Sequence, residues 1–289
     1  MARGIGMTLP LPYPFDREYL QLALVAGLVV GAAAPLIGTF LVQKRLSLLG
    51  DGLGHVAFAG VAAGLFLGVW PIWSALVAAL LGAVAIEWLR TRGRESGDLA
   101  LALFFYSGIA GGVVLSGLAG SLDGGILTYL FGSILTVNAS DAWTIVALGI
   151  VIVVVIGRTW RALFSIVLDE EAARVAGLPV DRLNLLLAGL AAVTVVAAMR
   201  VVGILLVAAL MVLPVGAAQR LASSFRSTLV IAAAVGASSA VVGLGLARVW
   251  GLAPGGTIVL VSATAFVVAA LLTGRGRGRG RGTLVGERP

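Results

Sequence analysis

Residues 183–219 read LNLLLAGLAAVTVVAAMRVVGILLVAALMVLPVGAAQ, an apolar run with a single cation, Arg200, near its middle. As one helix this run would be about 55 Å long at 1.5 Å per residue, whereas the hydrocarbon core of a membrane is about 30 Å thick. We therefore predict two membrane spans, at 183–199 and 201–219, with a turn at Arg200. A single crossing would invert the topology of everything that follows.

The composition of the whole chain favours a membrane protein. Of its 289 residues, 60% are hydrophobic and only 11% are charged, and the mean hydropathy is +1.09. Soluble domains are about half apolar and a quarter charged, so this chain has too little polar surface to coat a particle in water. It has no cysteine, which excludes disulfides and thiolate metal sites, and one histidine, His55.

Further apolar runs predict an all-α polytopic protein with nine membrane helices, or eight with a re-entrant segment. The other predicted spans are 19–42, 51–70, 72–89, 99–120, 142–157, 228–249 and 256–273. With nine crossings and the N-terminus outside, all of the 20 Lys and Arg residues except Arg3, Arg17, Arg200 and Arg248 face the cytoplasm. This distribution follows the positive-inside rule, which favours nine spans.

The chain divides into a short extracellular segment, residues 1–18, a transmembrane domain, 19–273, and a basic tail, 274–289. The first segment lacks the pattern of a signal peptide. A short helix, partly inserted or extracellular, is expected within 121–141. The Arg-Gly repeat at 275–282 is expected to be disordered, cytoplasmic and in contact with anionic lipid rather than with nucleic acid.

The sequence LGDGLGHVAFAG, residues 49–60, places an acid and an imidazole inside a predicted span. Asp51 and His55 are four residues apart, so a helix puts both on one face. Charged groups in a span cost about 2.5–3.5 kcal/mol on insertion scales and therefore indicate function. This pair suits Zn²⁺ or Mn²⁺, although Asp51 as a helix N-cap and His55 as a packed core residue are alternatives. A homodimer would bring two such pairs together and supply four ligands.

The longest polar segment between spans is LDEEAARVAGLPVDRLN, residues 168–184. It predicts a short cytoplasmic helix with Glu170, Glu171 and Arg174 on one side, ended by Gly177 and a following proline. A compact exposed helix of this kind suits docking into a groove of a partner protein. An ordinary solvated loop helix is the alternative.

Pro214 lies inside the apolar run and predicts a helix break, which in membranes is tolerated where it lines a cavity or packs on neighbours. Met211, three residues earlier, either faces the same pore or packs in the core. Glycines at four-residue spacing indicate close helix packing: Gly60, Gly64 and Gly68, and likewise Gly108 and Gly112. The chain contains no GxxxxGK[ST] phosphate loop, so ATP binding by that route is not expected.

The segment RLSLLGDGLGHVAFAGVAAGLFLG, residues 45–68, resembles the signature segment of the permease subunits of bacterial zinc and manganese ABC importers. The resemblance continues through 127–141, 169–184 and 201–218, and covers the chain from about Glu18 to about Thr273. It implies a fold similar to that of the vitamin B12 and siderophore permeases. It also implies a homodimer in the bacterial plasma membrane that moves divalent metal ions by alternating access.

The same resemblance implies roles for particular residues. Asp51 and His55 would line the ion path, without a permanently bound cofactor. The segment 169–180 would be the coupling helix that rests on a separate ATPase, of which two copies bind. Its candidate residues are Asp169, Glu170, Glu171, Arg174 and Gly177.

Other implied features concern the partners. An extracellular metal-binding protein would deliver the ion, and the chain itself would not be an enzyme. The alternatives are a permease for a metal chelate or siderophore, a gradient-driven secondary transporter, and a small intramembrane enzyme using Ser107 or Ser133.

Overall fold

A computed structural model describes residues 12–91, 97–120, 124–133 and 138–277. The secondary structure of these residues is helical, and nine of the helices are long and apolar enough to cross a membrane. The predicted all-α polytopic fold with nine spans is therefore confirmed. The first eleven residues and residues 278–289, which hold most of the predicted basic tail, lie outside the described part of the chain.

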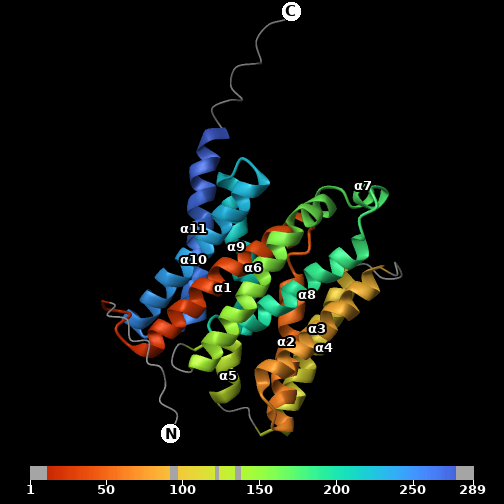
Figure 1. Cartoon of the computed structure of the whole chain (residues 1–289). Helices are drawn as coiled ribbons and strands as arrows, with labels where there is room; N and C mark the ends of the chain where they lie inside the picture. The colour runs from red at the N-terminus through yellow and green to blue at the C-terminus, as the bar shows by residue number, and fades with distance from the viewer. Residues whose placement is uncertain (1–11, 92–96, 121–123, 134–137, 278–289) are drawn as a thin grey trace, which may run out of the picture.

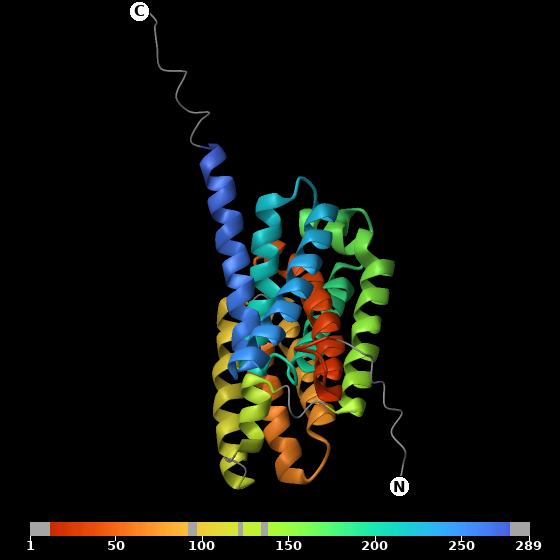
Figure 2. The ribbon, with the colours of Figure 1, turned by 90° about the vertical axis from the view of Figure 1, so that its left-hand side faces the viewer.

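The helices are arranged along one common direction, as the two views show (Figures 1 and 2). The spans are α1 Glu18–Gln43, α2 Leu49–Leu67, α3 Pro71–Thr91, α4 Gly97–Leu118, α6 Ala139–Leu168, α8 Val180–Ala198, α9 Ile204–Leu221, α10 Phe225–Trp250 and α11 Pro254–Arg277. Helix α11 therefore extends four residues beyond the predicted end of the last span. Two short helices, α5 (Gly124–Phe131) and α7 (Glu170–Val175), lie at opposite ends of the bundle, which we name the α5 end and the α7 end.

Helix α1 is central to the packing, because it contacts α6, α8, α9 and α10. On one side α2, α3 and α4 pack together, and on the other side α9, α10 and α11 do so (Figure 1). Helix α8 joins the two groups through contacts with α2 and α3 on one side and α9 on the other, and it also contacts α1 and α6. The α2 segment that carries the predicted ion ligands is thus held by α3, α4, α8 and α9.

The turn between α8 and α9 explains why the apolar run 183–219 crosses twice. Gly203 adopts φ +92°, a conformation open mainly to glycine, and the backbone of α5 approaches so closely that a Cβ on Gly203 would overlap Leu130 and Phe131. Arg200 in the same turn forms an ion pair with Asp141 at the start of α6, at 2.6 Å. The predicted turn at Arg200 is therefore present, and it is fixed by contacts with α5 and α6.

The glycines at four-residue spacing pack helices together, as predicted, except Gly68, which ends α2 with φ +68° and where a Cβ would meet nothing within 4 Å. A Cβ on Gly60 would lie 2.8 Å from the Cα of Ala75 in α3. A Cβ on Gly108 in α4 would lie 2.6 Å from the backbone carbonyl carbon of His55 in α2. Since backbone atoms cannot swing aside as a flexible side chain can, these glycines set the separation of α2 from α3 and α4.

Gly108→Ala is expected to destabilise the protein by about 1–3 kcal/mol, the usual cost of forcing extra atoms into a packed contact. The matched control is Gly111→Ala in the same helix, where a Cβ would make only ordinary contact, 3.8 Å from Ala59. Unfolding of both variants in detergent, followed by SDS titration, measures the difference. Equal stability of the two variants would contradict the close contact between α4 and the His55 backbone.

Candidate functional site

Asp51 and His55 both lie on α2, close to its beginning. The helix starts at Leu49, its N-cap residue is Leu48, and no side chain caps it. Asp51 is therefore the third residue of the helix rather than its N-cap. The structure removes that alternative explanation for the carboxylate. Both side chains are half-buried.

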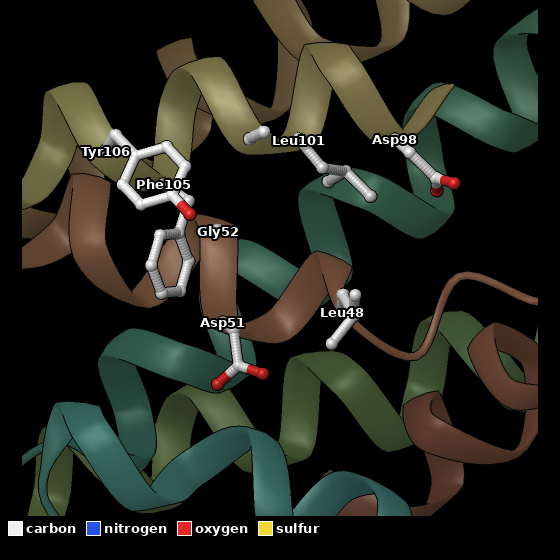
Figure 3. A pocket seen from close by; sticks show the side chains of 8 residues that line it. Leu48, Asp51, Gly52, Asp98, Leu101, Phe105 and Tyr106 are labelled. Carbon is white, nitrogen blue, oxygen red and sulfur yellow. The ribbon is translucent and has the colours of Figure 1, made fainter. Parts of the chain in front are cut away.

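Asp51 lines a cavity of about 380 Å³ between the start of α2 and the start of α4 (Figure 3). From α4, Asp98, Phe105 and Tyr106 line the same space. Figure 3 shows the carboxylates of Asp51 and Asp98 well apart, so the two acids do not form a common ligand pair in this chain. The walls are otherwise largely apolar.

His55 lies one turn further along α2 and does not line this cavity. Its imidazole packs edge-on against the ring of Phe105, with the centroids 4.3 Å apart. Phe105 itself lines the cavity, so this one ring contacts both the imidazole and the space beside Asp51.

Neither Asp51 nor His55 has an ion pair or a hydrogen-bond partner among the described residues. Polar side chains within a span normally find such partners. Among the same residues, no three His, Cys, Asp or Glu side chains come together as a metal site would require. One chain therefore offers two unpaired ligands and no complete coordination shell.

The predicted docking helix is present as α7, at the opposite end of the bundle from α5 (Figure 1). Asp169 is its N-cap and accepts a hydrogen bond from the Ala172 N–H at 2.9 Å. Glu171 is exposed, and Gly177 ends the segment with φ +82°. Arg174 is exposed and pairs with Asp181 at the start of α8, at 2.8 Å.

Glu170 differs from the other candidates on α7, because it points into the bundle. Its Oε2 lies 2.8 Å from Nζ of Lys44 at the end of α1, and its Oε1 accepts a hydrogen bond from Asn184 of α8 at 3.0 Å. Lys44 also donates to Asn184 Oδ1 at 2.6 Å. We call these three residues the Lys44 network. Sequence reasoning missed Lys44 and Asn184, although a lone lysine at the end of a span was a visible signal.

The electrostatics of the Lys44 network favour an ionised Glu170. Partial burial acts to raise the pKa of Glu170, but the hydrogen bond and positive charge of Lys44, with a hydrogen bond from Asn184, outweigh burial and lower it. Because the pKa of Glu170 is lower in the folded protein than in the unfolded chain, its ionised form stabilises the fold at any pH above the unfolded-state pKa. This stabilisation is lost as the pH falls through the folded-state pKa. Glu170 is therefore ionised at neutral pH.

Met211 and Pro214 lie in the packed interior of the chain. Met211 is 1% exposed, and Pro214 is also buried. Helix α9 continues through Pro214 from Ile204 to Leu221, so the predicted helix break is absent. The Met211 sulfur lies near Gly50 of α2, and its backbone lies against Gly38 of α1. Met211 thus holds α9 against α1 and α2 rather than facing an opening, and Pro214 is buried one turn further along the same helix.

A second buried polar site lies at the α5 end and was not predicted as a pair. Asp141, 2% exposed, accepts hydrogen bonds from Nε and a terminal nitrogen of Arg200 at 3.1 and 2.6 Å. The Arg200 guanidinium also lies over the ring of Tyr129 in α5, 5.1 Å from its centroid. This site therefore ties α5, α6 and the α8–α9 turn together.

Comparison with protein families identifies the fold. Residues 16–273, nearly the whole chain, match the ABC 3 transport family. The chain belongs to this family. It is accordingly the non-catalytic membrane subunit of an ABC transport system, whose ATPase is a separate subunit. The predicted resemblance to ABC importer permeases is confirmed, as is the prediction that the chain is not an enzyme.

Relatives within the ABC 3 transport family include proteins described for different metals. The chain is 31% identical to the manganese transport system membrane protein MntC of Halalkalibacterium halodurans, over 90% of each chain. It is also 31% identical to the high-affinity zinc uptake system membrane protein ZnuB of Haemophilus influenzae, over 87% of this chain and 97% of that protein. Sequence similarity therefore does not distinguish the two metals.

Two solved structures resemble the fold of this ABC 3 family member. PsaBC from Streptococcus pneumoniae, in complex with Fab, superposes with a TM-score of 0.80 at 30% identity, over 88% of this chain and 92% of that one. An inward-facing metal-chelate type ABC transporter superposes with a TM-score of 0.63 at 20% identity, over 88% and 87%. The second match supports the predicted similarity in fold to chelate permeases.

Proposed function

We propose that this chain is the permease subunit of an ATP-driven importer that moves Zn²⁺ or Mn²⁺ across the bacterial plasma membrane. Two copies form a homodimer, two copies of a cytoplasmic ATPase bind it, and an extracellular binding protein delivers the ion. Alternating access then moves the ion past Asp51 and His55. The chain holds no permanent cofactor, and the metal is its cargo.

One observation carries this proposal: a carboxylate and an imidazole lie on one face of a membrane helix, half-buried and without partners among the described residues. Structural polar groups in a span are normally paired, so unpaired ones indicate a transported ligand. Asp51 already lines a cavity, and two ligands per chain suit an ion that must be released. The homodimer follows from the same geometry, because a second copy would complete the coordination shell.

The charge distribution supports a cytoplasmic α7 end. Among the described residues, Arg17, Arg200 and Arg248 belong to the α5 end. The remaining cations of the described residues belong to the α7 half of the bundle: Lys44, Arg45, Arg90, Arg158, Arg161, Arg174, Arg182, Arg220 and Arg226, with Arg275 and Arg277 at the end of α11. By the positive-inside rule the α7 end faces the cytoplasm and the N-terminus lies outside.

The same assignment gives α7 its role as the helix that rests on the ATPase. Beside the exposed Glu171 and Arg174, Leu168 and Val175 are 75% and 90% exposed. Exposed apolar side chains beside charged ones, on an end that faces water, suit a surface that a partner protein covers. Glu170 contributes less to this surface than Glu171 does, because its carboxylate bonds Lys44.

Proteoliposomes test the proposal directly. They contain the permease, its ATPase and the metal-loaded binding protein, and Zn²⁺ or Mn²⁺ uptake is measured with ATP inside or outside. We expect uptake that needs ATP, stops when the ATPase carries an inactivating substitution, and persists when an uncoupler removes the proton gradient. Uptake that follows the gradient and ignores the ATPase would instead support a secondary transporter.

A further inference from the structure

The Lys44 network joins the ends of three elements that are far apart in the sequence. Lys44 ends α1, Glu170 begins α7, and Asn184 lies in the second turn of α8. Each member bonds the other two, at 2.6 to 3.0 Å. The Lys44 side chain is only 6% exposed, although it carries a full charge. Breaking a pair of this kind leaves a buried charge without a partner, so the three elements are held together strongly.

The link from Lys44 onward to α2 is short and internally bonded. The N–H groups of Lys44 and Leu46 donate to the Phe40 and Leu41 carbonyls, at 3.0 and 2.8 Å. Arg45 is the one described non-glycine residue with positive φ, at 60°. A corner held in this sparsely populated backbone conformation can change its geometry only slightly. It leads straight to α2, which begins at Leu49 and carries Asp51.

We propose that Lys44 is a positioning residue, through which a displacement of α7 is transmitted to the α1–α2 corner and so to Asp51. This inference rests on the proposed function, since it assumes that α7 rests on the ATPase and that Asp51 contacts the ion. When the ATPase moves α7, Glu170 carries Lys44 with it. The rigid corner then shifts the first turn of α2, and Asn184 couples the same movement to α8.

A neighbouring ion pair provides a matched control. Arg174 and Asp181 also join α7 to the start of α8, at 2.8 Å, but both side chains are more than half exposed. Water screens this pair, and it does not touch the α1–α2 corner. If every ionic link between α7 and the bundle were equally important for coupling, Asp181→Asn would have the same effect as a change at Lys44.

The test measures metal ions transported per ATP hydrolysed, in proteoliposomes of the complete complex, with whichever of Zn²⁺ or Mn²⁺ the wild type transports. Lys44→Met keeps the aliphatic stem but removes the charge. It is expected to lower this ratio about tenfold, within the range known for residues that modulate coupling between sites. ATP hydrolysis by the assembled complex should continue, and Asp181→Asn, which breaks the exposed pair without changing α7, should retain the wild-type ratio.

Charge exchange separates transmission from a merely structural role. In Lys44→Glu with Glu170→Lys, the Asn184 amide can turn over and still bond both partners. Lys44→Glu and Glu170→Lys alone should each lower the ratio of metal transported to ATP hydrolysed. We expect the double variant to restore most of that ratio. It also serves as the measurement if Lys44→Met does not accumulate in the membrane.

Two results would overturn the inference. One is a wild-type ratio of metal transported to ATP hydrolysed in Lys44→Met. The other is a ratio in the charge-exchange double variant no higher than in Lys44→Glu or Glu170→Lys alone. A loss of the ratio in Asp181→Asn to the same extent as in Lys44→Met would also overturn it. Failure of the proposed function is distinct, because wild-type proteoliposomes would then show no ATP-driven uptake of either metal.

Discussion

Replacing His55 with alanine is expected to lower ATP-driven uptake of Zn²⁺ or Mn²⁺ at least tenfold, since loss of even an outer-shell partner of a metal ligand costs about 10–100-fold. The chain should still insert and fold. The imidazole contacts Phe105 but has no hydrogen-bond partner among the described residues, so its removal leaves no structural bond broken. Initial uptake rates in proteoliposomes, normalised to the amount of folded permease, measure the effect.

Two further variants sharpen this test. Asp51→Asn keeps the shape of the side chain but removes its charge. The double variant, Asp51→Asn with His55→Ala, should take up no less metal than the poorer of the two single variants, because both groups act on the same ion and their effects are not additive. The control is Ser107→Ala in α4, whose hydroxyl bonds only the Leu103 carbonyl of its own helix. Uptake that survives the change at His55, or that fails only with Ser107, would refute the ion path.

Removing the charge of Asp141 is expected to destabilise the fold by about 3–5 kcal/mol, the usual cost of leaving a buried charge without its partner. Asp141→Asn is the appropriate change, because asparagine can still accept the hydrogen bond from the Asn138 N–H that caps α6. Arg200, with 11% of its side chain exposed, would then lose both of its bonds to a carboxylate. SDS titration of the detergent-solubilised protein measures the loss.

The exposed pair of Arg174 and Asp181, at the other end of the bundle, is a suitable control for stability. Arg174→Gln breaks an ion pair of similar length, 2.8 Å against 2.6 Å, that is in contact with water, and little change in stability is expected. Replacing both buried partners, by Asp141→Leu with Arg200→Met, should recover part of the lost stability, since no charge is then left unpaired. A stability of Asp141→Asn equal to that of Arg174→Gln would contradict the structural role of the buried pair.

The sequence by itself determined the nine spans, because hydropathy along a helix is a local property that a window of about 20 residues reports. It also placed Asp51 and His55 on one face, because the helical repeat fixes the relation of residues four apart. The docking helix α7 was predicted for the same reason, from Gly177 and the proline that follow it. These predictions needed only neighbouring residues and agreed with the structure, whereas the break predicted at Pro214 did not.

Only the tertiary structure decided which side chains meet. Lys44 finds Glu170 and Asn184 across 126 and 140 residues, and Arg200 finds Asp141 across 59. Pro214 suggested a break in α9, yet neighbouring helices bury it and the helix continues. His55 proved to pack against Phe105 of α4, a contact that no spacing in either helix reveals. Such contacts depend on how the helices pack against each other, and the periodicity of a single helix carries no information about its neighbours.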